Sequence, residues 1–333
     1  MTELSPAVAR RVADLSQEVR GTMHSAKARL ISDMDSRLKT KAEQHLHDFV
    51  KQAWPLVEPG VPFLDNWHIV LICEYLMAVS LGIIKRLWIN IPPRYSKSTL
   101  VSVMWPCWEW AAIKPSQSWV VSTYVQSLST TLSRKRRDIV SSPWYQSRWP
   151  MPLRPDLNTQ DEFGTTLGGV MIATSVGGRA TGLGGDRLLI DDPTDPGQAI
   201  SDTERERSNE WYFSTFASRL NDKRMGAIVG IQQRLHQHDM TGALTGLDIT
   251  DMNGHVLEGN GWTLLRIPLV AEQDEDLYSP LPGHRLIHSR KEGDLLWPER
   301  EGPEQIAEYK NREYVYAAQF QQRPSPKAGA MFQ

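Results

Sequence analysis

Cysteine is scarce in this chain: the 333 residues contain only Cys73 and Cys107, both in apolar surroundings. Two cysteines cannot make a disulfide scaffold, and their settings are typical of buried thiols in a reducing compartment. No secretory signal opens the chain, and its longest apolar stretch, 69–84, contains Glu74 and Ser80. This stretch predicts a buried helix rather than a membrane span.

Net charge is also small, at −2, while hydrophobic residues make up 40% of the chain. The composition predicts a globular protein, and any contact with nucleic acid must come from local patches rather than from overall charge. The basic run 134–137 is one such patch, although charge runs on helices are usually solvated faces. The twelve tryptophans indicate extensive aromatic packing.

Glycine is missing where a phosphate-binding loop would use it. An apolar run, 87–91, leads into a short loop that closes on Lys97 and Ser98, and a helix-compatible segment follows. This order is typical of a P-loop, whose usual pattern is G-x-x-x-x-G-K-[ST]. Ile91 and Ser96 occupy the two glycine positions. The alternative is an exposed proline-rich turn with a solvated lysine.

If the segment is a P-loop, its backbone N–H groups and the following helix N-terminus would cradle the phosphates of ATP. Lys97 would reach the β- and γ-phosphates, and the Ser98 hydroxyl would bind Mg²⁺. The residues predicted to bind nucleotide here are Pro93, Arg94, Tyr95, Ser96, Lys97, Ser98 and Thr99.

Two carboxylates follow a second apolar strand, 188–190. Asp191 and Asp192 stand at its C-terminal end, where open α/β sheets bind ligands. This is a Walker B pattern, in which Asp191 would hold Mg²⁺ and Asp192 would orient or deprotonate the attacking water. The alternative is a helix cap or turn, because Asp before Pro193 commonly starts one.

Predicted strands and helices alternate along the chain, which indicates an α/β fold with a mostly parallel sheet flanked by helices, of the P-loop NTPase (RecA/ASCE-like) class. Residues 1–50 predict an N-terminal helical arm, 51–322 the ATPase domain and 323–333 a linker. The predicted strands are 87–91, 119–123, 169–173, 188–190, 225–231 and 262–268. The predicted helices are 66–81, 99–112, 128–140, 201–221, 303–310 and 312–321.

The assembled pattern resembles the large terminase subunit of tailed bacteriophages, the ATPase that drives DNA into the procapsid. The resemblance spans roughly residues 55–333. The segments that carry it are Asn66-Trp67-His68, the loop 92–99, 174–182, Asp191-Asp192-Pro193, Gln233-Arg234-Leu235-His236 with Asp239, and Gln321-Gln322-Arg323-Pro324.

The resemblance implies further roles. Arg179 would be the arginine finger, with a DNA-phosphate contact or a solvated side chain as its alternative. Gln233 would begin a coupling motif that senses the γ-phosphate. Trp67 would lie near the adenine, or else in the core. Arg94 would contact phosphate or form a salt bridge with a core carboxylate.

The resemblance also implies partners: double-stranded DNA, the portal protein, the small terminase subunit and a homo-oligomeric ring, with no membrane. The setting would be the host cytoplasm and, transiently, the portal vertex. No nuclease is expected from this chain, because the family's nuclease would follow the linker. Two alternatives remain, another nucleic-acid-dependent ATPase such as a helicase and a scaffold that does not hydrolyse ATP.

Overall fold

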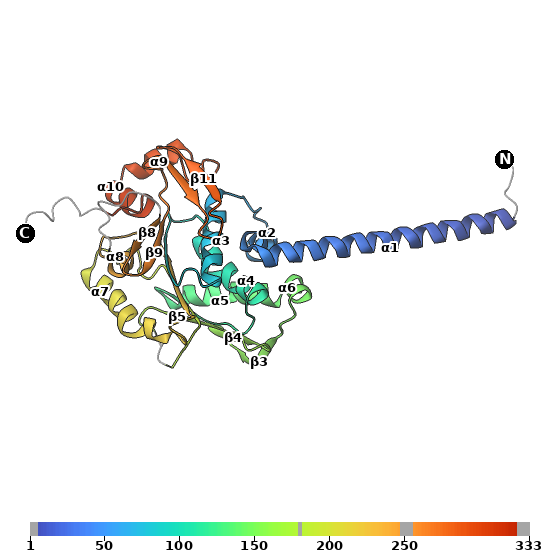
Figure 1. Ribbon diagram of the computed structural model, residues 1–333, viewed down its shortest axis with the longest axis horizontal. Coiled ribbons are helices and arrows are strands. Elements are labelled where there is room, and N and C mark those ends of the chain that lie inside the picture. Colours follow the sequence, from blue (N-terminus) through green and yellow to red (C-terminus); the bar gives the residue numbers. More distant parts are fainter. Residues whose placement is uncertain (1–5, 179–181, 247–255, 325–333) are drawn as a thin grey trace, which may run out of the picture.

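A computed structural model describes residues 6–178, 182–246 and 256–324 of the chain (Figure 1). A nine-stranded sheet in the order β3-β4-β5-β2-β6-β7-β1-β9-β8 forms its centre, and helices cover both faces. The fold is therefore α/β, with a mostly parallel sheet, as predicted. A separate two-stranded sheet pairs β10 with β11.

The strands β5, β2, β6, β7, β1 and β9 run parallel, whereas β3, β4 and β8 join the edges in antiparallel pairing. The strands are β1 (Arg86–Asn90), β2 (Ser118–Thr123), β3 (Leu153–Asn158), β4 (Glu162–Thr165), β5 (Val170–Ser175), β6 (Arg187–Asp191), β7 (Ala227–Gln232), β8 (Val256–Gly259), β9 (Trp262–Arg266), β10 (Glu275–Tyr278) and β11 (Leu286–Arg290).

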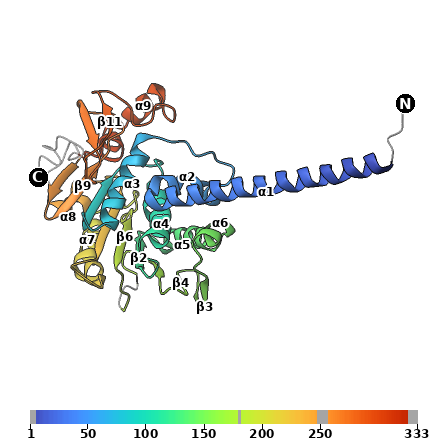
Figure 2. The same cartoon turned by 45° about the vertical axis from the view of Figure 1, so that its right-hand side comes forward.

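The helices include a long N-terminal arm, α1, that projects from the body in both views (Figures 1 and 2). The helices are α1 (Pro6–Gln44), α2 (Leu46–Val57), α3 (Trp67–Ser80), α4 (Trp105–Ala112), α5 (Gln126–Ser141), α6 (Pro143–Arg148), α7 (Asp202–Trp211), α8 (Met240–Thr245), α9 (Pro303–Lys310) and α10 (Glu313–Val315). Among the described residues, none of these helices combines the length and apolarity needed to cross a bilayer.

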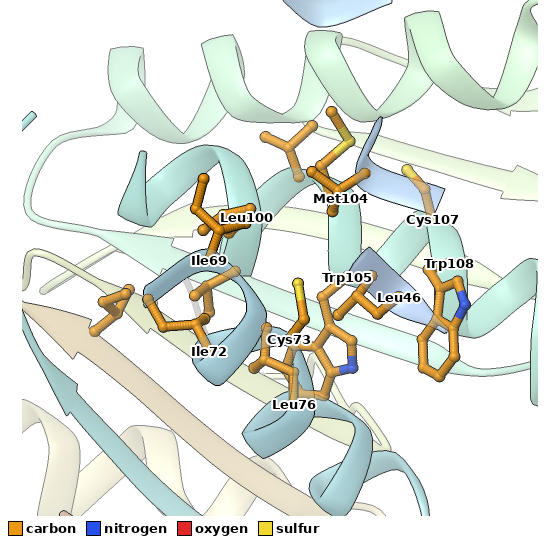
Figure 3. Packing of buried hydrophobic residues seen from close by; sticks show 14 of the residues in the cluster. Leu46, Ile69, Ile72, Cys73, Leu76, Leu100, Met104, Trp105, Cys107 and Trp108 are labelled. Atoms are coloured by element: carbon orange, nitrogen blue, oxygen red, sulfur yellow. The ribbon is translucent and has the colours of Figure 1, made fainter. Parts of the chain in front are cut away.

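The central strands are apolar on both faces, as expected where helices cover a parallel sheet on each side. Every residue of β6 and of β7 is buried. One face packs on α2, α3, α4 and α5, where Leu46, Ile72, Leu100 and Trp105 meet in the larger core (Figure 3). The other face packs on α7 and α8 through a smaller core that contains Trp88, Ile190 and Trp211.

A glycine in β7 sets the packing of the smaller core. Trp88 of β1 stands directly beside Gly230 of β7 in the parallel register. A Cβ atom at Gly230 would lie 1.9 Å from Trp88 Cζ3 and 2.1 Å from Cε3. The indole ring therefore needs the open surface of a glycine, and Trp88 also packs edge-on against Trp262 of β9.

All six predicted strands are confirmed to within a few residues, because each is a short apolar run. The predicted helix 99–112 instead begins as a π-helical segment, Thr99–Met104, before α4. The predicted helix 201–221 is confirmed to within two residues as three helical segments in succession: α7, a second π-helical segment, Tyr212–Phe216, and a 3₁₀ turn, Ala217–Arg219. The predicted end of the arm, residue 50, lies inside α2 rather than at the end of a helix. The division of the chain into domains stays a prediction.

Candidate nucleotide and magnesium site

The predicted P-loop leaves the carboxyl end of β1 and turns into a helix that begins at Lys97. Two residues of the turn adopt left-handed backbone conformations, Arg94 with φ 71° and Ser96 with φ 60°. Glycine adopts such angles without cost, whereas other residues are disfavoured there. Ser96 therefore takes the conformation that the usual glycine would provide.

The helix after the loop has a π-helical segment, Thr99–Met104, just before Pro106. Pro106 has no N–H group to donate to the carbonyl of Ser102, so regular α-helical pairing fails at this turn. The N–H group of Trp105 donates instead to the carbonyl of Leu100, five residues earlier. Arg136 Nη1 donates to the Ser102 carbonyl over 2.7 Å. A buried guanidinium from α5 thus holds the P-loop helix.

Asp191 lies at the end of β6, fully buried, and both its oxygens accept hydrogen bonds from this helix. Ser98 Oγ donates to Oδ1 over 2.9 Å, and Ser102 Oγ donates to Oδ2 over 2.6 Å. Burial, and then the neighbouring charge of Asp192, raise the pKa of Asp191, while both serines and Lys97 act in the opposite direction. The sequence analysis predicted Ser98 as a Mg²⁺ ligand, which stays a prediction, and it did not single out Ser102, which stands one turn later.

Asp192 pairs with the P-loop lysine. Lys97 Nζ lies 2.9 Å from Asp192 Oδ2, and the lysine side chain is almost completely buried. Asp192 Oδ1 accepts the backbone N–H of Gln233 over 3.3 Å. The aspartate adopts φ 44°, another left-handed conformation in a non-glycine residue. The predicted loop, the two carboxylates and the end of β7 therefore meet at the carboxyl ends of the central strands.

The other predicted P-loop residues differ in accessibility. Arg94 is exposed and forms no ion pair within the described part of the chain. Tyr95 is buried, and its hydroxyl donates to Glu301 Oε2 over 3.0 Å. Pro93 and Thr99 are half-buried. The Tyr95 side chain thus belongs to the core, and only its backbone is placed to face a phosphate.

Trp67, at the start of α3, stacks on His288 of β11 with ring centroids 5.1 Å apart and planes 7° apart. The guanidinium of Arg290 lies 5.1 Å from the same ring. The indole therefore already has partners from the β10–β11 hairpin. Its neighbour His68 is fully buried beside Tyr95 and Trp297, and burial lowers the pKa of His68 to about 3.

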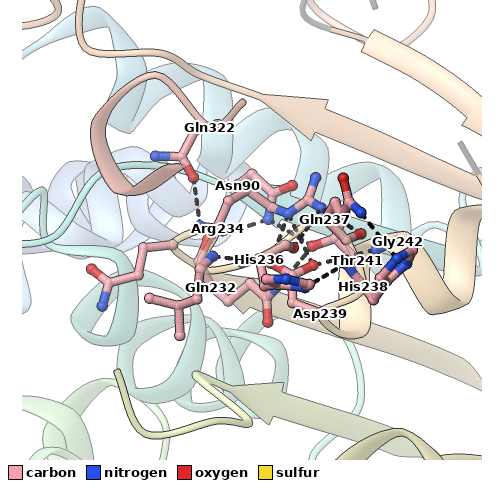
Figure 4. Close-up of polar contacts among 12 residues, drawn as sticks. Asn90, Gln232, Arg234, His236, Gln237, His238, Asp239, Thr241, Gly242 and Gln322 are labelled. Carbon is pink, nitrogen blue, oxygen red and sulfur yellow. Dashed lines mark hydrogen bonds and ion pairs between the residues drawn. The ribbon is translucent and has the colours of Figure 1, made fainter. Parts of the chain in front are cut away.

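Gln233 and Arg234 follow β7, and Arg234 lies in a dense polar cluster with Asp239 and Gln322 (Figure 4). Arg234 Nε donates to both oxygens of Asp239, at 2.9 and 2.8 Å, and Asp239 also caps α8. The Arg234 N–H donates to Gln322 Oε1 over 2.9 Å. Gln233 Oε1 is buried without a hydrogen-bond partner among the described residues. The strand end is therefore tied to the C-terminal segment.

Arg179, the predicted finger, lies outside the described residues. The basic run does not form a single basic face, because Arg136 is buried, Lys135 pairs with Glu58, and Arg137 lies over Phe163. Only Arg134 is exposed. Burial lowers the pKa of Arg136 to about 10.

The donor set at Asp191 fits Mg²⁺. This cation prefers oxygen ligands and is usually held in nucleotide sites by one or two carboxylates, phosphate oxygens and water. Ser98 Oγ and Asp191 supply a hydroxyl and a carboxylate in direct contact. No group of three or more His, Cys, Asp or Glu side chains gathers to hold a metal in the described ranges. The arrangement suits a metal that arrives with a nucleotide.

Comparisons with known proteins give fold similarity only. No protein-family model matches the chain, and no curated protein matches it. The large terminase of bacteriophage HK97 is similar in structure, with 13% identity and a TM-score of 0.43, over 60% of this chain and 40% of that chain. A variant ATPase domain of the large terminase of Thermus phage P74-26 is similar over 73% of this chain and 91% of that chain, with 11% identity and a TM-score of 0.48.

Proposed function

We propose that the chain is a Mg²⁺-dependent ATP hydrolase. One observation carries the proposal: Lys97 and Ser98 of the loop contact Asp192 and Asp191, respectively, across 2.9 Å each. A solvated lysine in a surface turn would not be buried against a strand-end carboxylate. The alternative interpretation of Asp191-Asp192 as a simple cap also fails to explain why Asp191 accepts hydrogen bonds from two hydroxyls of the P-loop helix.

Each residue has a distinct task in this proposal. Lys97 exchanges Asp192 for the β- and γ-phosphates, and the loop N–H groups bind phosphate oxygens. Ser98 and Asp191 hold Mg²⁺, which when bound neutralises phosphate charge. Asp192, released from Lys97, orients the attacking water and accepts its proton. Gln233, joined to Asp192 through its backbone, links this carboxylate to the end of β7.

We further propose that hydrolysis drives double-stranded DNA into a viral procapsid, in the host cytoplasm and at the portal vertex. The ordered motif set between Asn66 and Pro324 supports this function. The portal protein and the small terminase subunit would be the partners, and Arg179 would act on a phosphate as the finger. A helicase remains the alternative, and it would unwind duplex DNA, which a packaging motor would not.

The test is ATP turnover by the purified chain with Mg²⁺, with and without double-stranded DNA. Lys97→Ala should abolish turnover, whereas Lys114→Ala, at an exposed lysine outside the site, should not change it. Asp192→Asn should keep ATP binding and lose hydrolysis, while Asp191→Asn should weaken Mg²⁺-dependent binding. Wild-type turnover in the Lys97 variant would reject the site, and an inactive wild-type chain that still binds ATP would favour the scaffold.

A further inference from the structure

The predicted P-loop holds two residues in left-handed conformations, and neither of them is glycine. Arg94 has φ 71° and Ser96 has φ 60°, and Tyr95 stands between them. Non-glycine residues in this region strain the backbone, and they persist where the surrounding structure holds them in place. The Arg94 side chain is exposed and that of Ser96 is half-buried, whereas Tyr95 is fully buried. Of the three side chains, Tyr95 is therefore the one that joins this turn to the core.

The Tyr95 ring contacts residues from two segments that are distant in the sequence. His68 of α3 meets the ring edge-on, with centroids 5.7 Å apart. Trp297, on the segment between β11 and α9, lies 6.3 Å from it, centroid to centroid. The guanidinium carbon of Arg300, on the same segment, lies 5.7 Å from the centroid of the Tyr95 ring. Aromatic and cation–π contacts favour particular ring orientations, so these neighbours together fix the position of the tyrosine side chain.

The hydroxyl group of Tyr95 has a partner in the same distant segment. It donates to Glu301 Oε2 over 3.0 Å, and 206 positions separate the two residues in the sequence. Burial, and then the charge of Glu301, raise the pKa of Tyr95, so the hydroxyl keeps its proton and remains a donor. The backbone N–H groups of Arg300 and Glu301 both donate to the carbonyl of Trp297, at 3.0 and 3.1 Å. The acceptor for the Tyr95 hydroxyl therefore lies on a hydrogen-bonded turn.

We propose, on the basis of the nucleotide function proposed above, that Tyr95 and Glu301 are positioning residues for ATP. Their hydrogen bond holds the loop in its phosphate-binding conformation although glycine is missing. A usual P-loop reaches left-handed angles without strain, because glycine adopts them freely. Here the side chain between the two strained residues is fixed at its far end, so the peptide groups on either side of it are held as well. The loop is ordered before ATP arrives, and binding need not order it.

Calorimetric titration of the full chain with a non-hydrolysable ATP analogue and Mg²⁺ tests this role. Tyr95→Phe keeps the ring and removes the hydroxyl. It should raise the dissociation constant roughly 10-fold, because the apparent constant rises as the fraction of chains with a competent loop falls. Glu301→Ala should act in the same direction, whereas Glu301→Gln, whose amide oxygen can still accept the bond, should stay within about threefold of the wild type. Glu299→Ala changes an exposed glutamate of the same turn and should leave the constant unchanged.

Glycine at position 96 distinguishes positioning of the loop from a general loss of structure. Because glycine adopts φ 60° without strain, Ser96→Gly in the Tyr95→Phe chain should restore the dissociation constant to within about threefold of the wild-type value. Turnover at saturating ATP should change little in all these variants, because Lys97 and the two carboxylates are kept. A lower maximal rate with unchanged affinity, or no rescue by glycine, would overturn the positioning role.

Hydrogen exchange of the loop amides, 94–99, in the nucleotide-free chain tests the Tyr95–Glu301 bond independently of ATP. Tyr95→Phe should speed exchange in this segment and leave that of the central strands unchanged. Unchanged loop exchange, or wild-type affinity in the Tyr95→Phe chain, would refute the positioning role and leave the proposed function standing. A wild-type chain that binds no analogue, although its loop exchange responds to Tyr95→Phe, would refute the proposed function and the positioning role with it.

Discussion

Replacing Ser102 with alanine would measure how strongly the P-loop helix holds the Walker B carboxylate. Ser102 is fully buried, and its hydroxyl donates to Asp191 Oδ2 over 2.6 Å. A hydrogen bond to a charged group contributes about 1.5–3 kcal/mol to stability. At pH 8, Ser102→Ala should lower the free energy of unfolding by about that amount, and it should raise the pKa of Asp191 further because one stabilising donor is lost.

Ser133 on α5 supplies a matched control. Its side chain is also fully buried, but its hydroxyl has no hydrogen-bond partner among the described residues. Ser133→Ala removes the same atom without breaking a bond, so its cost should be small or even negative. Urea unfolding of the two variants would compare their midpoints, provided that the slope of the unfolding free energy against urea concentration is unchanged. Equal losses of stability would refute the argument that the Asp191 contact stabilises the fold.

Three further predictions concern stability. His68→Phe should make the free energy of unfolding less dependent on pH below pH 6.5. In the wild-type chain the unfolded imidazole takes up a proton near pH 6.5, whereas the buried imidazole does so only near pH 3. The wild-type free energy of unfolding therefore falls by about 1.4 kcal/mol for each unit by which the pH is lowered between these values. Thermal melts should show Ser96→Gly tolerated and Ser96→Val destabilised by about 1–3 kcal/mol, because a β-branched residue resists φ 60°. Asp239→Ala should lower the free energy of unfolding in urea by about 3–5 kcal/mol, because it leaves Arg234 buried and unpaired. Asp239→Asn, which keeps the helix cap, should lower it less. Equal losses in the two variants would mean that the charge of Asp239 does not contribute.

The central sheet could be predicted from the sequence because a buried parallel strand is a continuous apolar run between turn residues. The edge strands β3 and β8 and the hairpin strand β10 could not, since they are largely polar and mostly exposed or half-exposed. Their existence depends on neighbours that are distant in the chain. The sequence also could not predict the backbone conformation of a loop without glycine at position 96. The structure shows that Ser96 adopts a left-handed conformation, with φ 60°.

At the site, the P-loop and Walker B patterns predicted Lys97, Ser98, Asp191 and Asp192, and the structure brings these residues into contact. These patterns missed Ser102, although a hydroxyl four residues after Ser98 lies on the same helix face and could have been noticed. The sequence did not predict the burial of Arg136, because the three basic residues beside it make the segment resemble a solvated run. Its guanidinium donates to the Ser102 carbonyl, which Pro106 leaves without its usual helical donor.

Gly230 and Trp88 have a consequence for variation among relatives of this chain. Since a single methyl group at 230 would overlap the indole ring, Gly230 cannot gain a side chain while Trp88 is kept. The pair should therefore covary, with a small side chain at 88 wherever 230 carries alanine or a larger residue. Sequences that break this rule would have to move β1 and β7 apart, and with them the loop and the carboxylates that those strands support.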